Sequence, residues 1–195
     1  MPARQQSASL SGSSGTNSAL WRFSLFAFVV ASIIWLGAVN ARLLIGNDIL
    51  KTGTAEFLEY INPDAEREVY RLLSLMSIAV IGGYTIAFTS SIIFLVFSPL
   101  RVKEHGWLLM SAILFYMFVP VEIYTLYLDW KMIYLEFFTT TDNDMFREIF
   151  MERIRALQGI PLIAMLCYYT VIGLAVFQPM KNRLVLSSVQ REQPA

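Results

Sequence analysis

The sequence predicts an all-α integral membrane protein, built as a four-helix transmembrane bundle with short extra-membrane helical extensions. Four apolar runs predict this class, at residues 23–44, 72–97, 107–128 and 157–177. Each run is close to or above the ~20 residues that a helix needs to cross ~30 Å of hydrocarbon. Charged residues make up only 15% of the chain and hydrophobic residues 56%, whereas a soluble domain carries about 25% charge.

The first predicted helix covers about residues 21–45 and follows a polar tail. Residues 1–20 are rich in Ser, Gly and Gln. Such a segment buries too little apolar surface to offset its ordering entropy, so a disordered tail is predicted. The run also resembles a signal peptide, with a small-residue cleavage site at Val39, Asn40 and Ala41. The long polar leader and the apolar continuation through residues 43–45 favour a retained helix.

The second predicted helix, 63–97, has the best-defined ends. Asn62 suits the N-cap, Pro63 the first turn, and Asp64 the positive end of the helix dipole. Ser98 and Pro99 end the helix. Its roughly 35 residues make it ~52 Å long, about three turns more than the hydrocarbon needs. Together with a short helix predicted just before it, this end forms an extra-membrane extension at residues 54–71.

The third predicted helix covers about residues 106–130, and the short 98–106 connection makes it an antiparallel neighbour of the second. Pro120 lies within it and predicts a local kink. Apolar residues at helical spacing then predict an amphipathic helix at about 143–156. This helix leads through a bend at Gly159 and Pro161 into the fourth helix, 157–178. The transmembrane domain thus covers residues 21–180, and 181–195 form a C-terminal tail.

Loop charge predicts the orientation in the membrane. The 98–106 connection carries Arg101 and Lys103, and the C-terminal exit carries Lys181 and Arg183. Because Lys and Arg in short loops favour the cytoplasmic side, we expect a multi-pass protein with both termini in the cytoplasm.

Composition argues against several classes of function. The formal net charge is zero, which argues against nucleic-acid binding. Cys167 is the single cysteine and His105 the single histidine, so an intrachain disulfide, a bis-His haem and a multi-His zinc site are excluded. The usual catalytic signatures are absent from the sequence. We therefore expect no enzymatic activity, metal or cofactor.

Glu122 is the main candidate functional residue, because it is an acidic residue well inside an apolar run. Intramembrane carboxylates are costly and mark functional sites by default. Thr125 and Asp129 fall on the same helical face as Glu122, at i+3 and i+7. Arg42 lies near the matching end of the first helix and Asn40 half a turn away. This predicts a Glu122–Arg42 ion pair whose hydrogen bonds are completed by Asn40 or a tyrosine. A proton or cation relay, or a water-filled vestibule, are the alternatives.

The second helix carries a stripe of small residues at four-residue spacing, formed by Ala79, Gly83, Ala87 and Ser91. Such stripes let two helix backbones approach closely. The stripe predicts either packing within the bundle or a docking face for a partner or a second copy.

Together these features favour a non-enzymatic accessory, assembly or scaffold subunit of a membrane complex. Its expected partners are the lipid bilayer and other membrane proteins or a second copy, with no nucleic acid. The alternative is a small transporter, channel or sensor that uses Glu122 and Arg42.

Overall fold

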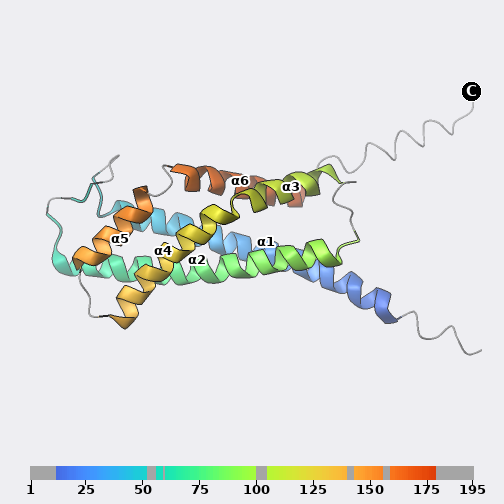
Figure 1. The fold of residues 1–195 in the computed structure, drawn as a ribbon, viewed down its shortest axis with the longest axis horizontal. Coiled ribbons are helices and arrows are strands. Elements are labelled where there is room, and N and C mark those ends of the chain that lie inside the picture. Colours follow the sequence, from blue (N-terminus) through green and yellow to red (C-terminus); the bar gives the residue numbers. More distant parts are fainter. Residues whose placement is uncertain are drawn as a thin grey trace, which may run out of the picture.

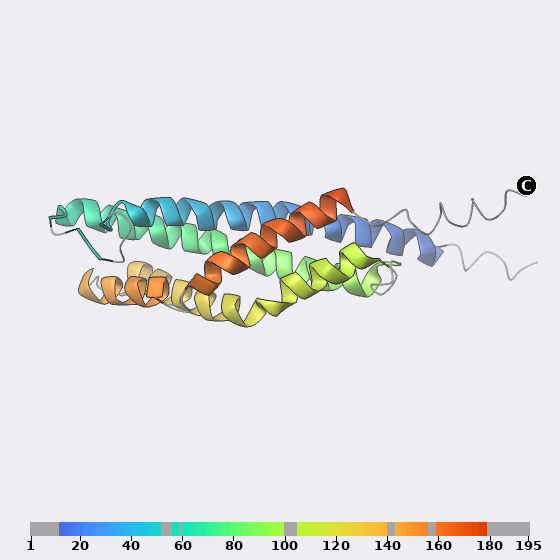
Figure 2. The same cartoon turned by 90° about the horizontal axis from the view of Figure 1, so that it is seen from above.

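The computed structural model describes residues 12–51, 56–58, 60–99, 105–139, 143–155 and 159–178. This part of the chain is helical, which confirms the all-α class. Its six helices are α1 (Gly12–Asn47), α2 (Pro63–Phe97), α3 (Gly106–Met117), α4 (Val119–Phe138), α5 (Asn143–Arg155) and α6 (Ile160–Phe177). Figure 1 shows them in one elongated array, and Figure 2 shows it from above.

Three of these helices are long and apolar enough to cross a membrane, namely α1 from residue 19 onward, α2 and α6. The pair α3 and α4 passes the same test together, although a 42° bend separates the two helices. The described part of the chain therefore has three such helices, or four if the bent pair is one span. These helices indicate a membrane protein.

The two long helices α1 and α2 lie side by side along most of their length (Figures 1 and 2). α1 begins at Gly12, within the tail predicted at 1–20, because an existing helix adds residues at little cost. Residues 1–11 and the predicted tail at 181–195 lie outside the described residues. α2 begins and ends as predicted, with the Asn62 side chain accepting a hydrogen bond from the Asp64 backbone N–H at 3.0 Å.

The predicted third helix, 106–130, is two helices in the structure. The chain breaks at Phe118 (φ −94°, ψ 2°), two residues before Pro120, because proline lacks the N–H that would bond the carbonyl of Tyr116. α4 then continues to Phe138, eight residues beyond the predicted end at about 130. The bend lets α3 pack against α6 while α4 packs against α2 and α5.

The extension before α2 differs from its prediction. Residues 56–58 are extended rather than helical, and Leu50 and Phe57 form an isolated antiparallel bridge. Backbone hydrogen bonds from Leu58 N–H to the Ile49 carbonyl (3.1 Å) and from Lys51 N–H to the Glu56 carbonyl (2.8 Å) join residues 56–58 to the end of α1. This pairing outweighs the local helical pattern at 56–58, while residues 52–55 and 59 of this segment lie outside the described residues.

The amphipathic helix is α5, and a left-handed Gly159 (φ 88°) precedes α6. α6 begins at Ile160 with Pro161 in its first turn, three residues after the predicted start at 157. The positive φ favours glycine at this position, because a side chain there would be strained.

Two large cores and a smaller third cluster around Phe94, Trp107 and Leu108 stabilise the helices. The first joins α1, α2, α3 and α6 around a set of aromatic and small residues that includes Trp35, Tyr84, Ala87, Phe115 and Tyr168. The second joins the Asn62 end of α2 to α4 and α5 through Tyr70, Leu73, Met132, Phe146 and Phe150. Between these two cores lie the buried charged side chains of Arg42 and Asp129.

Candidate functional site

The charged site between the two cores is centred on Asp129 of α4, whose side chain is fully buried. Its Oδ1 lies 2.5 Å from Nη1 of Arg42 on α1 and 2.5 Å from Nε of Arg153 on α5. Arg42 also donates to the Ser77 hydroxyl of α2 at 3.0 Å. The carboxylate of Asp129 therefore joins α4 to α1 and α5, and Arg42 extends the contact to α2. We call Arg42, Asp129 and Arg153 the charge triad.

The local sequence explains why these residues meet. Phe146, Ile149 and Phe150 form the buried face of α5, and Arg153 follows at i+3 and i+4 on that face. Its side chain is 18% exposed, whereas that of Arg42 is 4% exposed. Arg153 was not part of the site predicted from the sequence. Its position on the apolar face of an amphipathic helix, where a basic residue is unusual, would have identified it.

Glu122 does not form the predicted ion pair with Arg42. Arg42 pairs with Asp129 instead, about two turns, or ~10 Å, further along the same helix. Among the described residues, no Lys or Arg lies in ion-pair range of Glu122. Thr125 is one of its neighbours, with a hydroxyl that donates to the Glu122 carbonyl at 3.0 Å and lies 3.4 Å from its carboxylate. The Tyr168 hydroxyl also lies next to this carboxyl group. The predicted pairing was wrong because helical periodicity tells which face of its own helix a residue occupies. It does not tell which residue of the neighbouring helix lies opposite.

Asn40 also lies apart from the triad. Its side-chain amide donates to the Leu36 carbonyl at 2.8 Å and to the hydroxyl of Tyr169 on α6. Of the five residues in the predicted polar cluster, the structure therefore brings Arg42 to Asp129 and Thr125 to Glu122, and places Asn40 against a different helix.

A cavity of about 110 Å³ lies beside Glu122. Its polar wall is formed by Trp35, Arg42, Glu122, Thr125, Arg153 and Tyr168. Two buried N–H donors of this wall have no hydrogen-bond partner among the described residues, the Trp35 indole N–H and Arg42 Nη2. The Tyr168 hydroxyl, a third donor, lies next to the Glu122 carboxyl group. The cavity therefore combines a carboxyl group that has no ion pair with an excess of hydrogen-bond donors.

A second ionic cluster joins α5 to α2 outside the first core. Arg147 binds Glu66 through Nε at 2.5 Å and Nη2 at 2.8 Å, and Tyr70 donates to the same carboxylate. The hydrogen bond to Glu66 raises the pKa of Arg147 above its ordinary value, so this guanidinium stays charged. Arg67 pairs with Glu136 nearby at 3.1 Å. This geometry indicates that the cluster anchors α5.

The small-residue stripe of α2 faces other helices of the same chain. A Cβ atom on Gly83 would lie 2.9 Å from the Cβ of Trp35 on α1, so the glycine permits close contact of the two backbones. Ala87 is fully buried and Ala79 packs against the same core. The Ser91 hydroxyl is hydrogen-bonded to that of Tyr116 at 2.9 Å.

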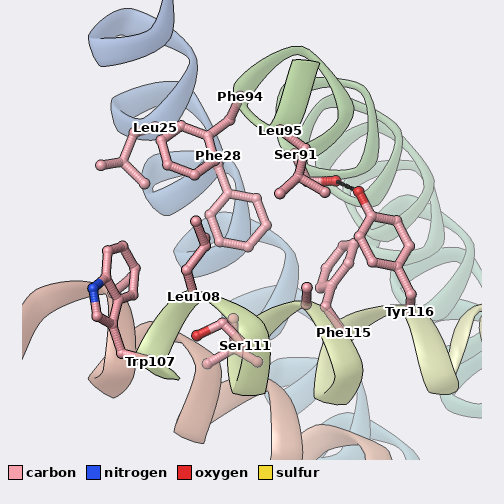
Figure 3. A pocket seen from close by; sticks show the side chains of 13 residues that line it. Leu25, Phe28, Ser91, Phe94, Leu95, Trp107, Leu108, Ser111, Phe115 and Tyr116 are labelled. Carbon is pink, nitrogen blue, oxygen red and sulfur yellow. Dashed lines mark hydrogen bonds between the residues drawn. The ribbon is translucent and has the colours of Figure 1, made fainter. Parts of the chain in front are cut away.

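Ser91 also borders a second cavity, of about 50 Å³, at the other end of the array. Figure 3 shows its lining of mainly aromatic and aliphatic side chains from α1, α2 and α3, with the hydrogen bond between Ser91 and Tyr116 at one edge. The small volume and apolar lining favour a packing defect over a binding site.

Neither a metal site among the described residues nor a similar protein adds information about the site. Within the described ranges, no group of three or more His, Cys, Asp or Glu side chains is placed to hold a metal ion. The chain matches no protein-family model, no curated protein and no solved structure.

Proposed function

We propose that the chain crosses a membrane four times, with α3 and α4 as one bent span and both termini on the cytoplasmic side. Trp21, Phe94 and Trp107 cluster at one level of the helices. The second level is the contact of Arg42 with Ser77 and Asp129. The two levels are 21 residues apart in α1 (Trp21 to Arg42), 17 in α2 (Phe94 to Ser77) and 22 in the α3–α4 pair (Trp107 to Asp129). At 1.5 Å per residue, these separations are roughly 25–33 Å. This separation supports the arrangement because it is close to the ~30 Å thickness of hydrocarbon.

In this arrangement the charge triad lies at the membrane boundary, and Glu122 lies about 10 Å inside it. The second core and α5 then lie outside the hydrocarbon, as an extra-membrane extension. Basic residues in the short 98–106 connection support the cytoplasmic placement of the opposite side.

The function we propose is that of a non-enzymatic accessory or assembly subunit that binds another membrane protein. A groove of about 620 Å³ between α4 and α5 carries this proposal. It is lined by Trp130, Lys131, Tyr134, Leu135, Thr139, Met145, Glu148, Ile149 and Glu152. Large exposed apolar side chains that line a groove are typical of interaction sites.

The groove favours a partner segment with an apolar face and a basic residue. Trp130, Tyr134 and Met145 are 50–56% exposed along it and supply apolar contact. Glu148 supplies an acidic group at the groove, and no ion pair of its carboxylate is recorded among the described residues. Because Trp130 lies close to the charge triad at the membrane boundary, the partner segment would leave the membrane at this level.

Site-specific photo-crosslinking in native membranes tests this proposal. A photoreactive phenylalanine at Tyr134 should give one discrete adduct, and Glu148→Lys should abolish it by opposing a basic partner. The matched control is the same probe at Ile163, an equally exposed residue (55%) of α6 outside the groove. An adduct of twice the chain mass would identify a second copy as the partner. Equal adducts from both positions, or none from Tyr134, would refute a docking site in the groove.

A proton- or ion-linked function is the second candidate, favoured by the position of Glu122 beside its cavity. The carboxyl group has no ion pair among the described residues, yet its side chain is only 9% exposed. Proteoliposomes containing the pure chain test this candidate through proton and ion flux. Flux that Glu122→Gln abolishes without lowering the melting temperature would place this function first, and an absence of flux would exclude it.

A further inference from the structure

The cavity beside Glu122 has more hydrogen-bond donors than acceptors. The Trp35 indole and the Arg42 guanidinium can only donate, and each keeps a buried N–H without a partner in the described structure. The Tyr168 hydroxyl borders the same cavity and lies next to the Glu122 carboxyl group, so it is a further donor of this wall. A ligand that supplies acceptor atoms would satisfy these groups, because buried donors are costly when they are left unpaired.

The charges around the cavity also favour a ligand that accepts hydrogen bonds, because they leave room for an anion. Arg42 and Arg153 both use Asp129 as their counter-ion, which leaves one positive charge in excess at the triad. Glu122 is the group that balances this charge when it is ionised. When Glu122 is protonated, a singly charged anion would restore neutrality, and the carboxyl group would itself become a donor.

The shape of the cavity agrees with a small group that enters from the side. About 110 Å³ is room for several small atoms, since one water needs about 10–15 Å³ on the same measure. Two residues of its wall, Leu43 on α1 and Leu162 on α6, are 49% and 56% exposed. They mark an apolar edge that faces lipid in the proposed four-span arrangement, at the level of the headgroups.

We infer that this cavity binds one anionic group together with one proton on Glu122. The group is a phosphate, carried either by a membrane lipid or as free inorganic phosphate. Its acceptor atoms would face donors of Trp35, Arg42 and Tyr168. This inference does not depend on a partner protein in the α4–α5 groove.

The protonation of Glu122 makes the binding depend on pH. The titratable and charged groups around Glu122 are Arg42 from α1, Tyr84 from α2, Asp129 from α4, Arg153 from α5 and Tyr168 from α6, while α3 has no charged residue. Of these, Glu122 is the carboxyl group without an ion pair. As the pH rises, ionised Glu122 repels the anion, so the affinity should fall by up to about tenfold per pH unit for one linked proton.

Calorimetric titration of the full chain in non-ionic detergent tests the inference. The probes are inorganic phosphate and short-chain phosphatidylglycerol, with short-chain phosphatidylcholine as the uncharged control, each at mildly acidic and mildly alkaline pH. Binding of phosphatidylglycerol alone would identify the lipid source, and binding of both anionic probes would include free phosphate. No binding of either anion, or equal binding of phosphatidylcholine, would overturn the inference.

Three conservative variants identify the site. Tyr168→Phe keeps the ring and removes a hydroxyl that lines the cavity, so anion affinity should fall about tenfold to a hundredfold, the effect of one hydrogen bond to a charged group. The melting temperature of the variant checks that it remains folded. Tyr84→Phe is the matched control, since its buried hydroxyl has no partner among the described residues and does not border the cavity. Glu122→Gln should bind the anion with little dependence on pH. Equal losses in the two tyrosine variants, or an unchanged pH slope in Glu122→Gln, would contradict the assigned site.

Discussion

Replacing Asp129 by Asn should unfold the protein at a much lower temperature. The substitution keeps the shape of the side chain but removes the counter-ion of two guanidiniums, and Arg42 is only 4% exposed. Breaking a buried ion pair from one side costs about 3–5 kcal/mol. Arg153 is 18% exposed and partly reaches solvent, so Arg42 dominates the loss. For a chain of this size, the expected decrease in melting temperature is about 6–20 °C.

The assay is thermal unfolding of purified protein in detergent, with Glu136→Gln as the matched control on the same helix. The side chain of Glu136 is only 6% exposed, but that of its partner Arg67 is 35% exposed, so the pair should contribute about 1 kcal/mol or less. The double variant Arg42→Met, Asp129→Leu should recover much of the loss, because a well-packed apolar pair replaces a buried ion pair at little cost. A melting temperature for Asp129→Asn no lower than that of Glu136→Gln would refute this reasoning.

Three further variants and one control variant test other contacts by the same unfolding assay. Gly83→Ala should lower the free energy of unfolding by about 1–3 kcal/mol, because the added Cβ would push α1 away from α2. Its control, Gly82→Ala, has nothing within 4 Å of the added Cβ and should be neutral or slightly stabilising. Equal effects of the two substitutions would contradict the close contact at Gly83. Phe146→Ala should lower the free energy of unfolding by about 3–5 kcal/mol, because the fully buried ring of Phe146 stacks on that of Tyr70 with 4.2 Å between the ring centres. A loss under about 1 kcal/mol would contradict this packing of α5 against α2. Glu122→Gln should change stability by less than about 1 kcal/mol, because no ion pair is broken; a larger loss would restore the predicted pairing with Arg42.

The features that the sequence predicted well are those decided by neighbouring residues. Asn62 and Pro63 start α2 and Ser98 ends it, because capping depends on groups within one turn. The kink was expected from Pro120 alone, although its consequence, a break into two helices at Phe118, also depends on the packing of α3 and α4 against different neighbours.

The features that the sequence did not predict depend on how far one helix lies along another. The prediction paired Arg42 with Glu122 from their expected depths in the membrane. In the structure, Arg42 lies opposite Asp129, about two turns further along the helix, and pairs with that residue. Arg153 and Arg147 reach carboxylates on α4 and α2 across long sequence separations. A single sequence records which face such residues occupy on their own helix, but it does not record the shift between helices.

The weak attachment of α6 has a mechanical consequence. Only 17% of its most apolar segment is buried within the described part of the chain, against 39% for those of α1 and α2, and its main protein neighbour is α3. In the proposed four-span arrangement, α6 would therefore contact lipid over more of its surface than protein. Under a force applied at the C-terminal end, α6 should leave first and at the lowest force, while α1 and α2 remain locked together through Gly83 and Trp35.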